Sequence, residues 1–186
     1  IIINPNFDIS YATLVPIATS LALCIAIEKI LKINPELKWP NDITIKGKKV
    51  AGVLVDTSII SNEIENMILG IGINFKIKPY KLASTIKKTP NFYGVTTLVK
   101  KNGNALPLVQ QFLHELENVF HLINSGRVKK IKNEWTKRSS TIGKNISIIT
   151  NEGNLNGKAV KIDSDGALII SKGKKTERIL VGDIAK

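Results

Sequence analysis

The longest apolar run of the chain, Ala12–Ile27, limits the folds that the chain can adopt. It covers about 16 residues, contains Pro16 near its start, and is followed by Glu28 and Lys29. A helix that crosses a membrane needs roughly 20 apolar residues, so this shorter run predicts a buried helix. Its first half is apolar on every side, and such a helix packs beneath a sheet. We therefore expect a layered globular protein with a helix over Tyr11–Ile33 and no membrane partner.

Further elements are expected on both sides of this helix. Strand patterns occur at Ile1–Ile3 (the end of a buried strand), Ile43–Ile45, Lys49–Asp56 and Met67–Phe75. Apolar residues that recur every four positions predict an amphipathic helix over Leu106–Ile123, and a short helix follows over Val128–Lys137. The segment Lys76–Val95 is interpreted as a long loop, and loops of this length are often functional.

The pattern changes after Ser139-Ser140 to short strands separated by glycine turns. These strands are expected at Asn145–Thr150, Leu155–Ile162, Ala167–Ser171 and Arg178–Val181. Four or five short strands in about 45 residues predict a small β-barrel. The sequence therefore predicts two domains, residues 1–138 and 139–186.

Charge and cysteine content exclude several kinds of site. The chain has 27 Lys and Arg against 15 Asp and Glu, a net charge of +12, but few of these cations are Arg. Proteins that read DNA bases rely on Arg. The lysine excess therefore favours the binding of phosphate groups or of an acidic partner over a surface that reads DNA bases. A compositional bias towards Lys, Ile and Asn is the alternative. One Cys (Cys24, expected in the core) and two His exclude a disulfide framework and a Cys- or His-rich metal site, and fit a reducing compartment such as the cytoplasm.

The pentapeptide Lys38-Trp39-Pro40-Asn41-Asp42 is the first candidate site segment. Pro forbids helix continuation, so Asn41 and Asp42 lie at the entry of the next strand. There they offer an amide and a carboxylate, with Lys38 as a cation and Trp39 as a flat apolar wall. The alternative is an ordinary turn with a core Trp.

Lys49 is the second candidate, because it begins an otherwise apolar strand. With a period of two, Lys49 shares a face with Ala51, Val53 and Val55. A lysine held partly inside a cleft binds an anion as a compact point charge. The alternative is a solvated hairpin lysine.

Gly70-Ile71-Gly72-Ile73-Asn74 is the third candidate. Two glycines two residues apart within a strand lack packing side chains and share a face with Asn74. They predict a bare strip of backbone against which a flat ligand can lie, while Asn74 contacts its polar end. A β-bulge is the alternative. The dinucleotide and P-loop glycine motifs are absent, so any nucleotide is held in another way.

Together, the segments KWPND (38–42), KVAGVLV (49–55) and GIGIN (70–74) resemble the biotin protein ligase family, in its order and at its spacing. The segment Gly143–Asp183 resembles the family's SH3-like C-terminal domain. The resemblance implies an α+β fold: a mixed sheet with helices, like the class II tRNA-synthetase core, plus a small C-terminal SH3-like β-barrel. It also implies ATP, biotin and Mg²⁺ as reactants, and a biotin carboxyl carrier domain as the acceptor partner.

The resemblance also implies a role for each site residue. Lys49 is the catalytic cation at the carboxyl–phosphate junction of biotinyl-5′-AMP, and Gly70 and Gly72 form the floor beneath biotin. The residues expected on the ATP and Mg²⁺ side are Lys38, Asn41, Asp42 and Asn74. Gly52, in the KVAGVLV segment, is also expected to bind the cofactors. No side chain is expected as a dedicated metal ligand.

Two departures and two alternatives accompany this resemblance. The family's Gly- and Arg-rich loop has no counterpart, since no Arg precedes Arg127, and Asp56 stands where the family usually has Glu. We therefore expect the chain to carry half of the active site, lacking the N-terminal part of the catalytic domain. The alternatives are a lipoate ligase or octanoyltransferase relative, and a non-catalytic binding module. A homodimer is a further expectation.

Overall fold

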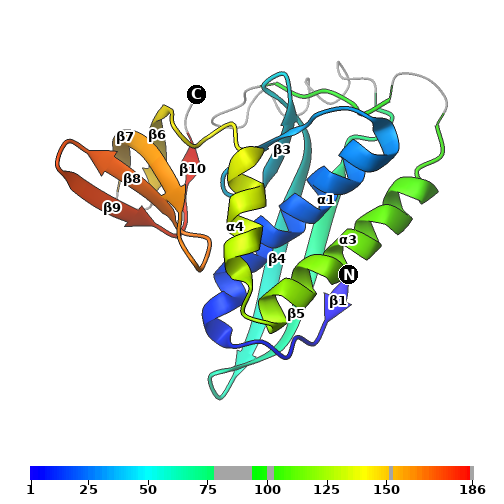
Figure 1. Ribbon diagram of the computed structural model, residues 1–186, viewed down its shortest axis with the longest axis horizontal. Coiled ribbons are helices and arrows are strands. Elements are labelled where there is room, and N and C mark those ends of the chain that lie inside the picture. Colours follow the sequence, from blue (N-terminus) through cyan, green and yellow to red (C-terminus); the bar gives the residue numbers. More distant parts are fainter. Residues whose placement is uncertain (78–93, 100–102, 151–152, 185–186) are drawn as a thin grey trace.

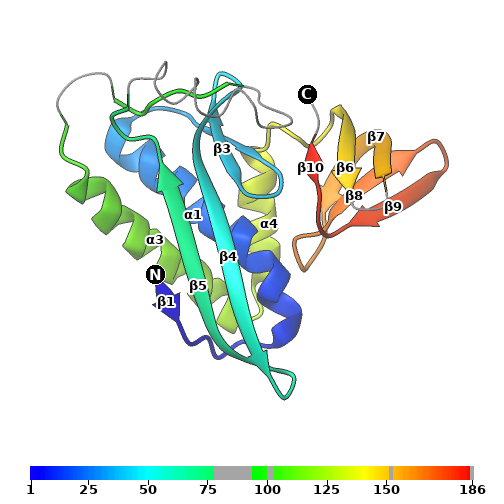
Figure 2. The ribbon, with the colours of Figure 1, turned by 180° about the vertical axis from the view of Figure 1, so that it is seen from behind.

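Two antiparallel sheets and one layer of helices make up the protein (Figure 1). The computed structural model describes residues 1–77, 94–99, 103–150 and 153–184. Most of the long loop expected over Lys76–Val95 lies outside these residues. The helices cover one face of the first sheet, and the view from behind shows that they leave its other face open (Figure 2). This α+β architecture is the one expected from the sequence.

The first sheet has the strand order β1-β5-β4-β3-β2. Its strands are β1 (Ile2–Ile3), β2 (Glu36–Lys38), β3 (Asp42–Ile45), β4 (Lys48–Ile60) and β5 (Glu63–Ile73). All ladders between these strands are antiparallel, and the parallel pairing of the expected mixed sheet is limited to isolated bridges such as Leu37–Ser139. The expectation of a buried strand at Ile1–Ile3 is wrong, because β1 lies at the sheet edge and Ile2 is 71% exposed.

The apolar run folds as a buried helix, as predicted. A 3₁₀ helix, η1 (Ile9–Leu14), leads into α1 (Val15–Leu31), with Pro16 in the first turn, where its missing N–H has no helical partner to lose. Lys32 ends the helix in the left-handed conformation, with φ of 55°. The segment Ile9–Leu31 is long and apolar enough to cross a membrane, but most of it is buried inside this protein.

Two further helices pack against α1. They are α3 (Leu106–Asn124) and α4 (Val128–Lys137), and both match the predicted positions. Lys29 of α1 forms an ion pair with the buried Glu115 of α3 at 2.7 Å. At the end of α4, Arg138 donates two hydrogen bonds to the Glu28 carboxylate, at 2.9 and 3.0 Å. These pairs hold the three helices together as one layer.

The C-terminal sheet has the strand order β10-β6-β7-β8-β9. Its strands are β6 (Asn145–Thr150), β7 (Gly153–Ile162), β8 (Leu168–Lys172), β9 (Lys175–Ile179) and β10 (Asp183–Ile184). The five short strands agree with an SH3-like domain. The expected strand over Arg178–Val181 is misplaced: β9 begins earlier, and Leu180 and Val181 lie in the connection to β10.

The two sheets meet at Trp39, which is 1% exposed. Its indole Nε1–H donates to the carbonyl of Gly166 at 3.1 Å, and its backbone N–H donates to Thr141 Oγ1 at 3.1 Å. Thr13 adds a third link by donating to the carbonyl of Asp165 at 2.8 Å. The domain boundary at 138/139 stays a prediction, and the side chains across it share one apolar core.

Candidate active site

Four residues from four neighbouring strands form a row across the open face of the first sheet. Lys38 of β2 lies opposite Asp42 of β3, Asp42 opposite Gly52 of β4, and Gly52 opposite Gly72 of β5. Residues directly opposite each other in a sheet point to the same face. Ala51, the neighbour of Gly52, is buried on the face that the helices cover. The row therefore lies on the face that the helices leave open (Figure 2).

Lys49 joins this row because of a β-bulge. Thr44 pairs with Lys49 and Ile43 pairs with Ala51, so Val50 is an extra residue on β4. Val50 and Ala51 are both buried, so the regular alternation of buried and exposed side chains along β4 is interrupted at this point. The prediction that Lys49 shares a face with Ala51 is therefore wrong. The bulge turns Lys49 to the open face.

On the open face, Lys49 forms an ion pair with Asp42. Its Nζ contacts Asp42 Oδ1, and its side chain remains 40% exposed. A Cβ atom at Gly52 would lie 3.0 Å from both Cε and Nζ of Lys49. The absence of a side chain at Gly52 therefore leaves the space in which Lys49 extends over β4. This arrangement places an ammonium group beside the glycine row and partly open to solvent.

Gly70 and Gly72 form a smooth strip beside this ammonium group. Their pairing with Leu54 and Gly52 is regular, so the alternative of a bulge at these glycines is wrong. A Cβ at Gly70 would lie 3.7 Å from the Leu54 carbonyl oxygen, and one at Gly72 would lie 4.0 Å from that of Gly52. Both glycines are exposed. The strip thus has the shape of a floor for a flat ligand, as the spacing predicts.

Two asparagines flank the row. Asn41 donates through Nδ2 to the carbonyl of Val53 at 2.5 Å, and Val53 N–H donates back to the Asn41 carbonyl at 3.0 Å. Asn74 donates through Nδ2 to the carbonyl of Lys49 at 3.5 Å, and its backbone N–H donates to Val50 at 2.8 Å. These bonds fix both side chains by their nitrogen ends. Each amide then keeps its oxygen for another partner.

Lys38, the other site lysine, is also half-buried. Its Nζ donates to the carbonyl of Ile184 in β10 at 3.3 Å. Burial lowers the pKa of Lys38, and the nearby Lys49 lowers it further, while Asp42 and Asp183 oppose both effects. The sequence analysis does not single out Asp183, which faces Lys38 from β10. Trp39, expected as an apolar wall, is instead a core residue.

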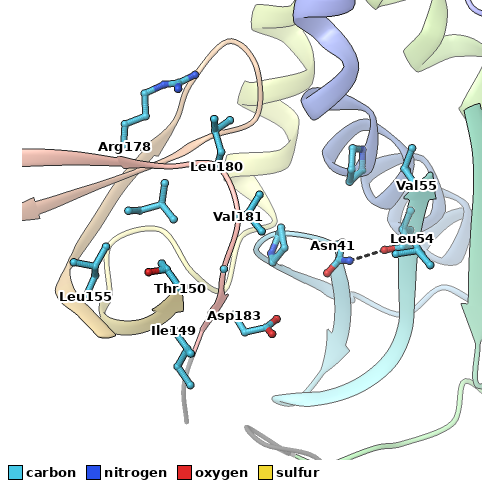
Figure 3. A pocket seen from close by; sticks show the side chains of 15 residues that line it. Asn41, Leu54, Val55, Ile149, Thr150, Leu155, Arg178, Leu180, Val181 and Asp183 are labelled. Atoms are coloured by element: carbon cyan, nitrogen blue, oxygen red, sulfur yellow. Dashed lines mark hydrogen bonds between the residues drawn. The ribbon is translucent and has the colours of Figure 1, made fainter. Parts of the chain in front are cut away.

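A groove of about 630 Å³ separates the first sheet from the C-terminal sheet at this point (Figure 3). Asn41 and Leu54 line one wall. Val181 and Asp183 line the other. In Figure 3 the Asn41 side chain points towards β4, where its hydrogen bond is drawn. Of the eight predicted site residues, Asn41 alone lines this groove, and Lys49 and the glycines of the strip lie outside its lining.

The arrangement suits a flat ligand that carries an anionic group. The strip accepts its flat part, and the Lys49 ammonium can meet a carboxylate or phosphate. Among the described residues, no group of three or more His, Cys, Asp or Glu could hold a metal ion. Mg²⁺ is usually held by one or two protein oxygens together with substrate phosphates. The carboxylate of Asp42 is a protein oxygen of that kind, in the row on the open face.

Family comparisons match both ends of the chain. Residues 1–74 match the biotin/lipoate A/B protein ligase family, and residues 141–186 match the biotin protein ligase C-terminal domain. The first match contains all eight site residues predicted from the sequence.

Individual relatives agree with these matches. The bifunctional ligase/repressor BirA of Bacillus subtilis is 27% identical over 99% of the chain and 56% of its own length. The biotin–[acetyl-CoA-carboxylase] ligase of Paracoccus denitrificans is 29% identical over 72% of the chain and 55% of its own length. The chain thus spans about half the length of these curated relatives.

Solved structures show the same fold. The biotin protein ligase of Aquifex aeolicus in complex with biotin and ATP superposes with a TM-score of 0.78 at 25% identity, covering 99% of this chain and 75% of that one. A mutant of that enzyme in complex with biotin gives a TM-score of 0.79, also at 25% identity, with 99% and 74% coverage. Both the first sheet and the C-terminal sheet are therefore included in the likeness.

Proposed function

This chain belongs to the biotin protein ligase family, and on that premise we propose that its protein activates biotin with ATP and transfers it to a carrier domain. In the first step a biotin carboxylate oxygen bonds to the α-phosphorus of ATP, and the bond to pyrophosphate breaks. In the second step the amine of an acceptor lysine attacks the carbonyl carbon of biotinyl-5′-AMP. The C–N bond forms, AMP leaves, and the amine gives up a proton.

The observation that carries this proposal is the Lys49 ammonium beside the glycine strip. Negative charge increases around the α-phosphate during adenylation, and a fixed cation stabilises it as it forms. Lys49 is held by Asp42 in this structure and needs only to move its flexible end to reach such a group. We assign Lys49 to the carboxyl–phosphate junction of the intermediate, and Gly70 and Gly72 to the floor beneath biotin.

The remaining site residues belong to the nucleotide side. Asn41 and Asp42 supply oxygens on the β3 side of the row and Asn74 supplies one on the β5 side, while Lys38 supplies a second cation. A bound Mg²⁺ would neutralise the phosphates and orient pyrophosphate as the leaving group. The protein oxygens that would hold it are those of the Asp42 carboxylate. Gly52 keeps the space that Lys49 occupies.

We favour biotin over lipoate as the substrate because of the family match of the C-terminal sheet. The family matched at residues 1–74 includes lipoate ligases, but the match at residues 141–186 is to the C-terminal domain of biotin protein ligases. Competition between biotin and lipoate for the purified protein separates these substrates. We propose a biotin carboxyl carrier domain as the acceptor and the cytoplasm as the location; a homodimer stays a prediction.

The test compares Lys49→Met with Lys48→Met in the full-length gene product. ATP–pyrophosphate exchange that depends on biotin measures the first step, and labelling of a carrier domain measures both. Removing a contact that stabilises transition-state charge typically lowers the rate by ~10²–10³. We expect that loss for Lys49→Met. Lys48→Met removes an exposed lysine of the same hairpin and keeps the wild-type rate.

Two results would contradict this proposal. Exchange at the wild-type rate in Lys49→Met would remove Lys49 from the reaction. A wild-type protein that binds biotin without exchanging pyrophosphate would instead support a non-catalytic binding module.

A further inference from the structure

The C-terminal sheet contacts the segment that leads directly into the site. Lys38 Nζ donates to the carbonyl of Ile184 at 3.3 Å, and the Trp39 backbone N–H donates to Thr141 Oγ1 at 3.1 Å. The Trp39 indole donates to the carbonyl of Gly166 at 3.1 Å. Three hydrogen bonds from two consecutive residues thus end on the C-terminal part of the chain.

These bonds lie close to the reacting part of the proposed site. Trp39 is buried, and just one residue separates it from Asn41. Lys38 lies directly opposite Asp42, which holds the Lys49 ammonium. A movement of the C-terminal sheet would therefore shift the Asn41–Asp42 turn and, through Asp42, the position of Lys49.

Lys38 occupies the centre of this connection. Its side chain is surrounded by charges from three strands: Asp42 of β3, Asp183 of β10 and Lys49 of β4. It bonds to β10 on one side and pairs with β3 on the other. The two carboxylates that face this half-buried lysine belong to different sheets, Asp42 to the first and Asp183 to the C-terminal one. In Figure 3, Asp183 lies across the groove from Asn41.

We propose that Lys38 is a positioning residue, through which the C-terminal sheet fixes the Asn41–Asp42 turn relative to Lys49. The inference rests on the proposed function. It assigns the C-terminal sheet a part in the adenylation step, in addition to any part in holding a partner.

The experiment compares four variants of the full-length gene product. Lys38→Met removes the cation and Lys38→Arg keeps it. Thr141→Val removes the acceptor of the Trp39 N–H without touching the open face. Thr13→Val is the matched control, because it removes another hydrogen bond between the first and C-terminal parts of the chain, from Thr13 of η1 to the carbonyl of Asp165 at 2.8 Å, that does not involve Lys38 or Trp39.

Lys38→Met and Thr141→Val are both expected to lower kcat of biotin-dependent pyrophosphate exchange by about 10- to 100-fold, since small displacements of a catalytic group have effects of that size. The KM for biotin stays unchanged, because the floor lies on β5. Lys38→Arg restores most of the rate, and Thr13→Val keeps it even where its melting temperature falls as much as that of Thr141→Val.

A second readout does not depend on activity. The Val53 N–H donates to the Asn41 carbonyl at 3.0 Å and reports on the turn. Its hydrogen exchange is expected to accelerate in Lys38→Met and Thr141→Val, and to stay unchanged in Thr13→Val. If the wild type fails to exchange pyrophosphate, the proposed function is wrong. The hydrogen exchange of the Val53 N–H still tests the positioning role in that case.

Two outcomes would overturn the inference. Equal rates and equal Val53 exchange in Thr141→Val and Thr13→Val would show that the links between the sheets are merely structural. A loss of rate in Lys38→Met with none in Thr141→Val would show that Lys38 acts without the C-terminal sheet.

Discussion

At the scale of single residues, the three glycines of the open face serve two purposes. A Cβ at Gly52 would meet Lys49 and Asp42 at 3.0–3.1 Å, so this glycine gives room to the protein's own ion pair. Gly70 and Gly72 have ordinary distances to their neighbours, so a methyl group would fit there without a clash. Their missing side chains instead leave room for a ligand.

Gly52→Ala is expected to displace Lys49 without unfolding the protein. The atoms that the new methyl group meets include the flexible end of a lysine, which can turn away into solvent. Biotin-dependent pyrophosphate exchange should fall by about 10- to 100-fold, the effect of a misplaced catalytic group. Steady-state exchange together with a melting curve measures both quantities.

Gly70→Ala tests the second purpose of the glycines, the room that they leave for a ligand. Replacing Gly by Ala inside a strand stabilises it by roughly 0.5–1 kcal/mol, so the melting temperature should rise slightly. Biotin affinity should fall, because the methyl group stands on the proposed floor. Unchanged biotin affinity in a calorimetric titration of Gly70→Ala would remove the strip from the binding site.

Sequence periodicity predicts the glycine strip but not the direction of Lys49. Gly70 and Gly72 are two positions apart, and that spacing alone places them on one face. The face of Lys49 depends on the bulge at Val50, which follows from its pairing with β3 and leaves no mark in an apolar run. The bond from Lys38 to Ile184 joins residues 146 positions apart, and no local pattern predicts such a partner.

At the scale of elements, one buried carboxylate connects α1 with α3. Glu115 is 6% exposed, and it accepts hydrogen bonds from Lys29 and Gln111 at 2.7 Å each and from Asn118 at 3.4 Å. Burial acts to raise the pKa of Glu115, but these donors outweigh it and the pKa is lowered. The charged form of Glu115 therefore stabilises the contact between the two helices.

Glu115→Gln is expected to destabilise the protein at neutral pH by about 1 kcal/mol, towards the lower end for bonds to charged groups because Lys29 is 54% exposed. A carboxyl with a lowered pKa in the folded state stabilises it above the unfolded pKa of roughly 4.3. That contribution is lost as the pH falls through the folded value. The difference between wild type and variant should therefore shrink below about pH 4.3.

Urea unfolding at a series of pH values measures this difference. Glu117→Gln, at an exposed position of the same helix, is the control and should show no such change with pH. If the stability difference between wild type and Glu115→Gln stays constant from about pH 7 to about pH 3, the assignment of a stabilising charge is contradicted.

The long elements could be predicted from the sequence, whereas the short strands β2 and β10 could not. The apolar repeat of α3 and the ends of α4 follow from their own residues, because each helix buries one continuous stripe. Strands β2 and β10 have three and two residues, too few for any alternation to appear. They exist because β3 and β6 offer edges to pair with.

At the scale of the whole molecule, Gly166 lies where the two sheets meet. It has φ of 89°, and a Cβ there would lie 2.8 Å from the Thr13 carbonyl oxygen and 3.2 Å from Leu14 Cα. Its own carbonyl accepts the Trp39 indole N–H. The backbones of the first and C-terminal parts of the chain approach this closely because no side chain separates them.

Gly166→Ala is therefore expected to destabilise both sheets together. A left-handed conformation costs an ordinary residue roughly 1–2 kcal/mol, and a forced contact in a packed interior adds about 1–3 kcal/mol. Gly173→Ala is the control: its φ of 66° imposes the first penalty, but nothing lies within 4 Å of its Cβ position.

Both tryptophans, Trp39 and Trp135, precede the C-terminal sheet and report on the first part of the chain. If the sheets unfold as one unit, Gly166→Ala lowers the urea midpoint of tryptophan fluorescence more than Gly173→Ala does, and circular dichroism gives the same midpoint. A fluorescence midpoint that stays at the wild-type value in Gly166→Ala would show that the two sheets unfold separately, and it would also weaken the case that the C-terminal sheet positions Lys38.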